Sequence, residues 1–369
     1  MALVHDWLTG MRGGEKVLDA VCELFPSAPL YTLVHVRGSV SVRIEARRVV
    51  TSVAQRLPAA RRAYRQYLPV FPTAVELWDL DRYDLVVSTS HCAAKSVVRP
   101  GRAVHVCYCH SPMRYAWDQF PAYFGPSQVG ALRSRLLRPV MASLARWDRE
   151  TAGRVDQFVA NSRYVAARIR RYYNRGSTVV YPPVDTAFYR PLDDPPRPGS
   201  GFLVVSALVP YKRLEVAIEA CRRVGARLTI VGRGPELGRL QQLAGPDVSF
   251  PGWVSDEEVR ARYQQAEAVL LPGVEDFGLV PVEAQACGTP VVTLRRGGAC
   301  ESVVPGTTGI LVEDESVEAF ADGLSAVRRL PLDRSAIRAQ AETFSRDRFL
   351  SGFRAVLEAA LASRRAAVR

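Results

Sequence analysis

The sequence lacks the features that mark a membrane-spanning, secreted or zinc-binding chain. No apolar run reaches the ~18 residues that a membrane-spanning helix needs. The first residues do not pair a basic stretch with an apolar one, so we expect no cleaved secretory signal. The seven cysteines are odd in number and match no zinc-binding or CxxC spacing. We therefore expect buried, reduced thiols in a cytoplasmic protein.

Acidic residues are scarce in the first half of the chain. Residues 1–190 hold 27 basic and 14 acidic side chains, whereas the remainder holds 22 and 23, so the net charge of +12 comes from the first half. Such an excess indicates an anionic partner: a membrane surface, a nucleic acid or a phosphorylated acceptor. The chain shows no RNP aromatic pattern, zinc-finger spacing or basic tail, so we expect no nucleic acid.

The 369 residues suffice for two domains of ordinary size. A Pro/Gly-rich stretch at residues 193–201 is the expected linker. On both sides of it, short apolar runs alternate with helical stretches, which predicts doubly wound α/β domains at 1–192 and 202–345. Residues 346–369 predict a helix that packs back on the first domain. Because ligands bind beyond the carboxyl ends of such strands, we expect the site in a cleft between the domains.

Hydrophobic patterning predicts the individual elements. Strands are expected at residues 1–5, 30–36, 85–88, 103–109, 157–160, 202–207, 227–231, 268–271 and 291–294. Helices are expected at residues 15–25, 214–224, 238–244, 256–266, 280–287 and 349–363.

Two groups of residues in the first domain are candidates for chemistry. Gly13 and Gly14 lie between the first strand and the first helix, where backbone N–H groups and the helix dipole favour phosphate. Taken alone, these two glycines fit an ordinary tight βα turn better than a phosphate site. His110 follows a predicted strand and would reach the same edge of the sheet, although a lone histidine is often structural.

Two further groups lie in the second domain. Glu275 and Glu283 stand eight positions apart around the start of a helix, where carboxylates can accept hydrogen bonds from a polyol and Gly278 can offer backbone N–H groups to phosphate. Acidic residues at a helix start are also favoured by the dipole alone. Lys212 and Arg213 follow a predicted strand, so they are placed either to neutralise a diphosphate or as a solvated pair.

Residues 56–68 mix arginine with tyrosine and leucine. A basic amphipathic segment of this kind suits an anionic lipid surface, but a solvated charged helix has the same composition. The sequence leaves both interpretations open.

Read together, these motifs resemble the retaining glycosyltransferases of family 4, which have the GT-B fold of two Rossmann-like doubly wound domains facing each other across a cleft. The most specific match is the E-x7-E motif from Glu275 to Glu283. The segments at residues 5–16 and 108–115 are most similar to bacterial mannosyltransferases that build surface polysaccharides. The resemblance covers nearly the whole chain.

The resemblance implies roles for residues of the second domain. Lys212 would bind the donor diphosphate, with Arg213 as a helper, and Glu283 would hold the ribose hydroxyls. Glu275 would hold the donor sugar and phosphate, together with the backbone at Phe277, Gly278 and Leu279.

Other implied roles concern the base, the phosphates and the acceptor side. Val254 would meet the base through its backbone, and Gly13 and Gly14 would lie against the phosphates. His110 would lie near the sugar, which makes His110, Glu275 and Lys212 the expected catalytic set. One departure matters: the family often has arginine five positions before the lysine, and Ala207 stands there. Arg213 or Arg12 would have to replace that cation, or donor binding is weaker.

We expect no metal and no cofactor beyond the nucleotide sugar, which is a co-substrate. Asp79-Leu80-Asp81 has the spelling of a metal-binding DxD motif, but a loop is expected there. Retention would normally suggest a double displacement, yet no carboxylate is obviously placed as the nucleophile. The resemblance instead implies a front-face route in which the leaving phosphate helps to deprotonate the acceptor.

The leading interpretation is therefore a hexosyltransferase that moves mannose from GDP-mannose to a lipid-linked or polysaccharide-precursor acceptor. It would be cytoplasmic, with peripheral contact to the anionic inner leaflet of the cell membrane. A UDP-sugar donor on the same fold is the first alternative. An epimerase of the same fold and a non-catalytic nucleic-acid-binding or membrane-binding protein are the others.

Overall fold

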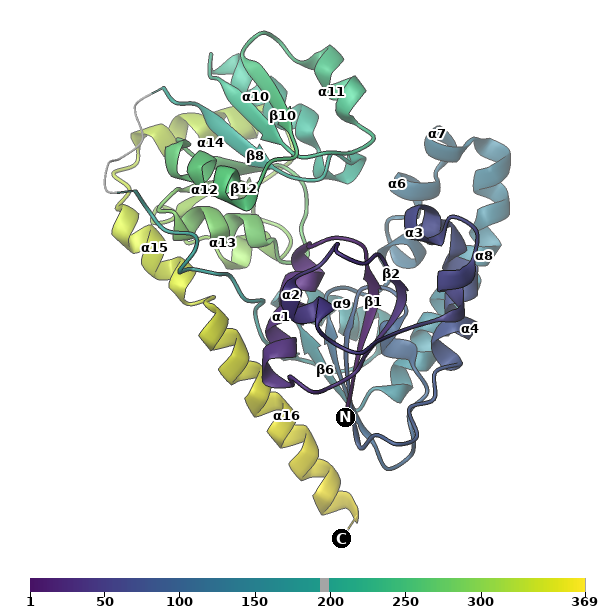
Figure 1. Cartoon of the computed structure of the whole chain (residues 1–369). Coiled ribbons are helices and arrows are strands. Elements are labelled where there is room, and N and C mark those ends of the chain that lie inside the picture. The colour runs from purple at the N-terminus through teal and green to yellow at the C-terminus, as the bar shows by residue number, and fades with distance from the viewer. Residues whose placement is uncertain (193–198, 369) are drawn as a thin grey trace. The chain divides into compact units, whose positions relative to one another are not determined.

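The computed structural model describes residues 1–192 and 199–368, which form two α/β units (Figure 1). The first unit comprises residues 1–183 and the C-terminal segment from Phe349 onward, and the second comprises Val184–Arg348. Of the expected linker at 193–201, residues 193–198 lie outside the described residues.

The first unit is built on a parallel seven-stranded sheet with strand order β3-β2-β1-β4-β5-β6-β7. Every residue of the central strand β1 is buried, because side chains cover both faces of the sheet. The strands are β1 (Ala2–Leu8), β2 (Leu30–His35), β3 (Val49–Thr51), β4 (Leu85–Ser90), β5 (Val104–Cys109), β6 (Gln157–Ala160) and β7 (Thr178–Val179).

Residues of β1 contribute to two hydrophobic cores. Val4 and Trp7 join the core that includes α4 (Phe71–Glu76) and α8 (Ala131–Glu150), whereas Leu3 and Leu8 join the core that includes α1 (Gly13–Leu24) and α16 (Arg346–Val368). The remaining helices of this unit are α2 (Val42–Glu45), α3 (Ala60–Ala63), α5 (Arg114–Trp117), α6 (Phe120–Phe124), α7 (Pro126–Val129) and α9 (Arg163–Tyr173).

The helix α16 joins the first unit through a cluster of aromatic rings. Phe349 and Phe353 stack with ring centroids 5.6 Å apart, and both meet Tyr108 of β5 edge-on at 5.6 and 6.0 Å. These contacts explain why a segment far along the chain belongs to the core of the first unit.

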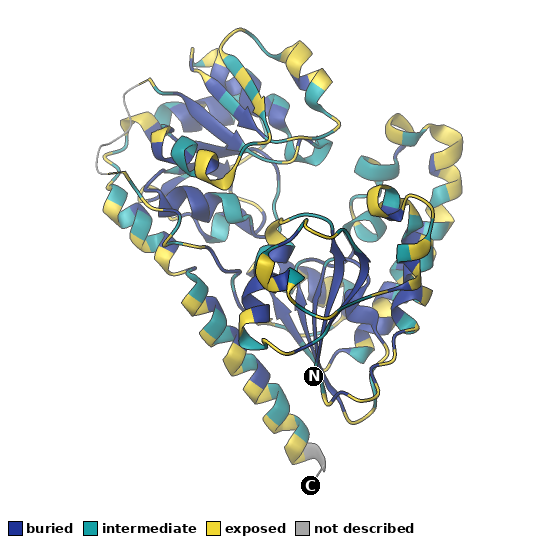
Figure 2. Cartoon of the chain, viewed as in Figure 1, coloured by how far each residue is buried: buried dark blue, intermediate teal, exposed yellow. Residues whose placement is uncertain are grey.

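The second unit is built on a parallel six-stranded sheet with strand order β10-β9-β8-β11-β12-β13. Figure 2 shows its strands as mostly buried, with exposed residues concentrated on the helices around them. The strands are β8 (Phe202–Val205), β9 (Leu228–Val231), β10 (Val248–Gly252), β11 (Val269–Leu271), β12 (Val291–Leu294) and β13 (Gly309–Val312). The helices are α10 (Leu214–Arg223), α11 (Leu237–Leu243), α12 (Asp256–Gln265), α13 (Leu279–Ala286), α14 (Val317–Arg329) and α15 (Arg334–Glu342).

The first unit ends at Pro183, earlier than the boundary at residue 192 expected from composition. The segment after Pro183 is hydrogen-bonded to the second unit. Val184 N donates to Phe344 O at 3.0 Å, and Arg338 donates to the carbonyls of Thr186 and Tyr189 at 3.1 Å. Pro/Gly-rich composition predicted a linker at residues 193–201, whereas these hydrogen bonds decide which unit the residues just before it join.

The seven cysteines are free thiols, as the sequence predicted, with six buried and Cys300 partly buried. Burial raises the pKa of the Cys22, Cys107, Cys221 and Cys287 thiols to about 12, so these side chains stay protonated at neutral pH.

The aromatic cluster under α16 generates a stability prediction. Phe353 is fully buried, so Phe353→Ala should cost about 3–5 kcal/mol in the free energy of unfolding. Thermal unfolding followed by circular dichroism measures the effect. The neighbouring Arg354 is exposed, so Arg354→Ala is the matched control and should unfold like the wild type. Equal melting temperatures for the two variants would contradict the packing described for α16.

Candidate active site

The two carboxyl-end loops of the second sheet bring Lys212 and Glu275 together. Lys212 ends a 3-10 turn after β8, and Glu275 lies in the loop after β11. The Lys212 Nζ donates to the Glu275 carboxylate, and the two side chains are only 14% and 18% exposed. The structure thus joins two of the three predicted catalytic residues in one half-buried ion pair.

Glycines allow these loops to approach so closely. A Cβ on Gly273 would lie 2.5 Å from the Tyr211 carbonyl oxygen and 2.7 Å from the Lys212 Cα. A Cβ on Gly298 would lie 1.9 Å from the Asp276 carbonyl oxygen. Since both obstacles are backbone atoms, any side chain at these positions would push the loops around the ion pair apart.

The helix α13 begins beside the ion pair. Gly278 precedes it with φ of +84° and offers no side-chain cap, so the first backbone N–H groups, from Leu279 on, lack a capping side chain at that position. A Cβ on Gly278 would lie 3.5 Å from Glu275 Cγ, which places these amides next to Glu275. Phe277 packs its ring on Phe344 at 5.6 Å, so its backbone is the part available to a ligand. This arrangement suits phosphate.

Glu283 lies one turn further along α13 and is 6% exposed. Its Oε2 accepts a hydrogen bond of 3.1 Å from the hydroxyl of Tyr263. Burial and then the Glu283 charge raise the pKa of Tyr263 well above its ordinary value, so Tyr263 remains a donor. Sequence reasoning missed Tyr263; the available signal was a tyrosine on the buried side of α12, whose hydroxyl needs a partner.

Arg213 follows Lys212 in the chain, but its guanidinium pairs with carboxylates other than Glu275. Its Nη1 is 2.6 Å from Glu315 and its Nε is 2.8 Å from Glu215. Two carboxylates therefore neutralise the predicted helper cation. Ala207 is exposed and contributes no cation of its own.

Val254, the predicted base contact, lies in the loop between β10 and α12. Its neighbour Trp253 is 66% exposed, and the Arg233 guanidinium lies 5.9 Å from the Trp253 ring centroid. An exposed aromatic face beside a backbone predicted to meet a base is a suitable stacking surface.

Gly13 and Gly14 form the first residues of α1, not the loop before it. Arg12 precedes the helix, and its backbone N–H donates to Glu15 Oε2 at 3.1 Å. A Cβ on Gly14 would lie 3.6 Å from both His110 Nε2 and His5 Cε1. The structure therefore brings the predicted glycine and His110 together at the carboxyl end of the first sheet.

His110 follows β5, and its Nε2 atom is buried without a hydrogen-bond partner among the described residues. Burial, followed by the nearby His91 and His5, lowers the pKa of His110 well below its ordinary value. His110 is thus neutral at physiological pH. An unpartnered buried nitrogen beside Gly14 is the kind of polar group that a bound substrate satisfies.

The structure separates the predicted site into two groups, one in each unit. Gly13, Gly14 and His110 belong to the first unit. The second unit holds Lys212, Arg213, Val254, Glu275, Phe277, Gly278, Leu279 and Glu283.

The basic segment at residues 56–68 does not form one amphipathic helix. It consists of 3-10 turns and the short α3, with Tyr64 and Leu68 buried in the core. Arg61, Arg62 and Arg65 remain exposed, so the outer face of this segment is cationic and not apolar. Its aromatic and aliphatic side chains pack in or against the hydrophobic core of the first unit, so they form no apolar face for a membrane.

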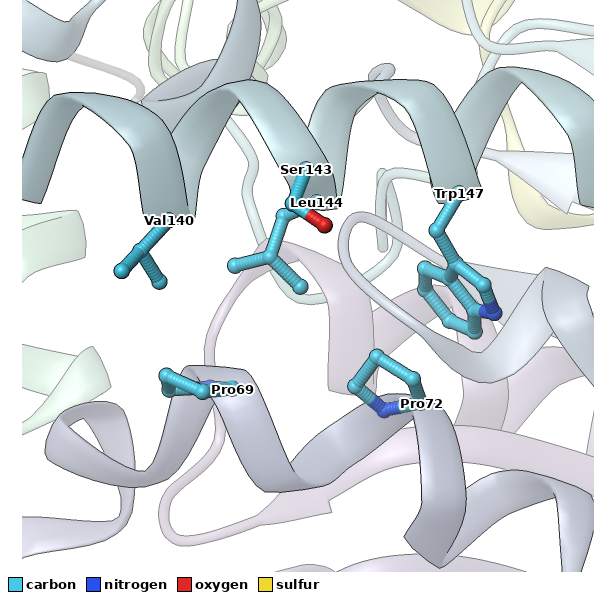
Figure 3. A pocket seen from close by; sticks show the side chains of 6 residues that line it. All are labelled: Pro69, Pro72, Val140, Ser143, Leu144 and Trp147. Atoms are coloured by element: carbon cyan, nitrogen blue, oxygen red, sulfur yellow. The ribbon is translucent and has the colours of Figure 1, made fainter.

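An apolar pocket of about 220 Å³ lies beside the end of this segment (Figure 3). Val140, Leu144 and Trp147 of α8 face Pro69 and Pro72 across it. It contains none of the predicted site residues, so it does not belong to the candidate active site.

Comparisons with known proteins show the family. A model described as Glycosyltransferase Family 4 matches residues 11–188, and one described as Glycosyl transferases group 1 matches residues 197–344. The chain belongs to glycosyltransferase family 4. It is thus a member of an enzyme family, and the two family matches fall largely on the two units described above.

Relatives of this family 4 chain include named mannosyltransferases. It is 35% identical over 204 residues to a GDP-mannose-dependent alpha-(1-6)-phosphatidylinositol monomannoside mannosyltransferase of Mycobacterium tuberculosis, covering 47% of this chain and 52% of the relative. It is 34% identical over 221 residues to a D-inositol 3-phosphate glycosyltransferase of Acidothermus cellulolyticus, covering 51% and 49%. The chain spans about half the length of the curated relatives it matches.

Solved structures extend the likeness to 97% of the chain. Anabaena HepE in complex with UDP has a TM-score of 0.70 at 19% identity, covering 97% of this chain and 100% of that one. The lipopolysaccharide outer core galactosyltransferase WaaB has a TM-score of 0.67 at 17% identity, covering 97% and 99%. At these identities the likeness concerns the fold, and it confirms the GT-B fold predicted for this family 4 chain.

Proposed function

We propose that the protein is a retaining glycosyltransferase that moves mannose from GDP-mannose to a lipid-linked or polysaccharide-precursor acceptor. The observation that carries this proposal is the half-buried Lys212–Glu275 pair at the start of α13, with Glu283 held by Tyr263 one turn further on. This arrangement offers a cation and helix amides to a diphosphate and a carboxylate to a ribose.

The chemistry of transfer asks mainly for stabilisation of negative charge on the leaving nucleoside diphosphate. Lys212 supplies an ammonium group, and the N-terminal amides of α13, from Leu279 on, supply fixed dipoles. Binding of the diphosphate would take Lys212 from Glu275, which frees that carboxylate to accept hydrogen bonds from sugar hydroxyls. His110 would meet the sugar on the acceptor side.

The choice of mannose and guanosine rests on the relatives named as GDP-mannose-dependent mannosyltransferases. A UDP-sugar donor is the competing possibility, because Anabaena HepE has been solved with UDP-glucose. Thermal shifts with GDP, UDP, ADP, dTDP and CDP, and then with the matching nucleotide sugars, distinguish the two.

We expect GDP and GDP-mannose alone to raise the melting temperature, since a ligand that binds the folded state stabilises it by mass action. Lys212→Ala and Glu283→Ala should each weaken nucleotide binding about 10- to 100-fold by removing a charge-assisted contact. Arg239→Ala and Glu318→Ala, whose side chains are 51% and 64% exposed, are the controls. A shift with UDP alone would overturn the mannose assignment, and no shift with any nucleotide would overturn the transferase.

We also infer that transfer needs no metal ion. The cationic and amide groups named above are available to meet the diphosphate charge. Asp79 and Asp81 of the DxD-like sequence lie in an exposed loop, where Asp79 Oδ1 accepts a 2.9 Å hydrogen bond from Asp81 N. In residues 1–192 and 199–368, no group of three or more histidine, cysteine or acidic side chains is arranged to hold a metal ion.

Excess EDTA should therefore leave the rate of sugar transfer unchanged. Release of the nucleoside diphosphate from the donor, measured with and without the chelator, checks this. A loss of about tenfold or more that Mg²⁺ or Mn²⁺ restores would show instead that a metal stabilises the leaving group.

We also propose that the protein contacts an anionic membrane, and that it does so through α8. Residues 119–147 contain four arginines and no acidic residue. On the N-terminal half of α8, Leu132 and Leu136 are 73% and 64% exposed and lie one turn apart, with Arg133 and Arg135 between them in the sequence. Leucines flanked by arginines suit the boundary between lipid headgroups and acyl chains.

The other end of α8 is fixed to the first unit. Asp148 is fully buried, lies 3.0 Å from Lys95 Nζ, and accepts hydrogen bonds from Trp117 Nε1 at 2.7 Å and Tyr173 OH at 2.9 Å. A rigid helix would therefore present Leu132 and Leu136 to a bilayer. Across residues 1–192 and 199–368, no helix has both the length and the apolar character needed to cross a membrane.

Wild-type protein should bind phosphatidylglycerol vesicles in preference to phosphatidylcholine vesicles at low salt. Leu132→Asp combined with Leu136→Asp should weaken this binding about tenfold or more. The double substitution puts negative charge where the bilayer would otherwise bury two apolar side chains. Val42 lies on α2 and is 84% exposed, so Val42→Asp adds charge away from α8 as the control. Equal vesicle binding by all three proteins, or salt-sensitive binding to random DNA instead, would contradict the proposed surface.

A further inference from the structure

The Tyr64 side chain brings two arginines together at the carboxyl end of the first sheet. Tyr64 is 5% exposed, and its ring packs on Trp7 of β1 with the centroids 4.9 Å apart. The Arg12 Nη1 lies 3.5 Å from the Tyr64 hydroxyl oxygen, and the Arg65 guanidinium lies over the same ring, 5.2 Å from its centroid. One tyrosine therefore holds a guanidinium at its hydroxyl and another at its face.

Neither of these two cations is neutralised within the first unit. In residues 1–192 and 199–368, no carboxylate forms an ion pair with the Arg12 or the Arg65 guanidinium. Glu15 Oε2 instead accepts a hydrogen bond of 3.1 Å from the backbone N–H of Arg12. In the second unit, by contrast, two carboxylates pair with Arg213. Because Arg12 and Arg65 are exposed and permanently charged, both can meet an anionic ligand.

The Tyr64 hydroxyl adds a donor between them. Thr9 Oγ1 donates to the Tyr64 oxygen at 3.2 Å, and Arg12 Nη1 donates to the same oxygen. Tyr64 is the acceptor in both contacts, and no group in the described part of the chain accepts the hydrogen of its hydroxyl. A mostly buried hydroxyl with an unused hydrogen, next to two guanidinium groups, suits an anion.

The arginine pair lies on the acceptor side of the proposed site. Arg12 stands two positions before Gly14, and a Cβ on Gly14 would lie 3.6 Å from His110 Nε2. The aromatic rings lead to the same place, since Trp7 meets His91 edge-on at 4.5 Å and the His91 centroid is 6.2 Å from that of His110. An anion on the arginine pair would thus share the sheet edge with His110, which the proposed function places beside the sugar.

The chemistry of the donors favours a phosphate over a carboxylate. A guanidinium binds an oxyanion through two parallel hydrogen bonds, so two arginines and a tyrosine offer more donors than the two oxygens of one carboxylate need. A phosphate ester has more free oxygens and carries more charge, and it can engage all three side chains. Arg65 also gives a role to the basic segment at residues 56–68, whose apolar side chains are used in packing.

We propose that Arg12, Tyr64 and Arg65 bind a phosphate group of the acceptor. This inference rests on the proposed function and narrows its substrate class. The acceptor would be a phosphorylated molecule, such as a sugar joined through phosphate to its lipid carrier, and not a neutral saccharide.

Isothermal titration with octyl phosphate tests the site, with octanoate and octyl glucoside as the carboxylate and neutral probes of the same chain length. Saturating GDP is present throughout, so that Lys212 is occupied. Octyl phosphate should bind the wild type about tenfold more tightly than either of the other probes. Arg12→Gln and Arg65→Gln should each weaken its binding about tenfold or more, because each removes a charge-assisted contact. Tyr64→Phe, which removes one neutral donor, should weaken it less.

The matched control is Arg48→Gln. Arg48 is also exposed, but it directly precedes β3 and so lies at the amino end of the same parallel sheet. This variant should bind octyl phosphate like the wild type. GDP affinity and melting temperature should stay at the wild-type values in every variant, which separates the arginine pair from the donor site and from folding.

Three results would overturn the proposal. The first is unchanged octyl phosphate binding in both Arg12→Gln and Arg65→Gln. The second is octanoate binding as tight as that of octyl phosphate, because the site would then not select phosphate. The third is a loss of GDP affinity in Arg12→Gln, which would assign this cation to the donor. A wild type that binds octyl phosphate through the two arginines but binds no nucleotide would overturn the proposed function alone.

Discussion

The carboxyl end of the first sheet depends on one buried charge, the carboxylate of Asp6. Burying a carboxylate is costly unless hydrogen bonds replace the water it loses. Asp6 recovers this cost through four backbone N–H groups, with His91 Nδ1 3.2 Å away, and in doing so it determines the path of the chain after β4. His91, the first residue of that path, has its ring centroid 6.2 Å from that of His110, and Gly14 lies against the His110 ring.

In the second unit, an ion pair between Lys212 and Glu275 joins the loops after β8 and β11. Lys212 and Glu275 neutralise each other, and their side chains are still 14% and 18% exposed. A half-buried pair has lost much of its hydration but remains accessible, so under the proposed function a diphosphate would compete with Glu275 for Lys212. The deeper Glu283 differs, since Tyr263 holds its orientation from within the core.

Arginine is abundant in this chain, but some arginines pair with carboxylates or backbone carbonyls whereas others remain exposed. Arg213 is neutralised by Glu215 and Glu315, and Arg338 donates to backbone carbonyls that join residues 184–192 to the second unit. Arg61, Arg62 and Arg65 are left exposed on the first unit, as are those of the acid-free stretch before Asp148. Net charge therefore indicated an anionic partner, whereas only the contacts show which arginines are available to it.

The sequence by itself determined the fold class, and it predicted where the candidate site residues of the second unit follow strands. Continuous apolar runs such as those of β1 and β5 require a sheet covered on both faces, and Glu275, Glu283 and Lys212 follow strands by local spacing. The short edge strands β3, β7, β10 and β13 were missed, because a few residues, some of them half exposed, carry little periodicity. Tertiary structure alone decided the pairing of Asp6 with His91, of Arg213 with Glu315 and of Tyr263 with Glu283. Those partners lie 85, 102 and 20 residues apart, and a carboxylate or hydroxyl reveals its partner only when folding brings the two within hydrogen-bonding distance.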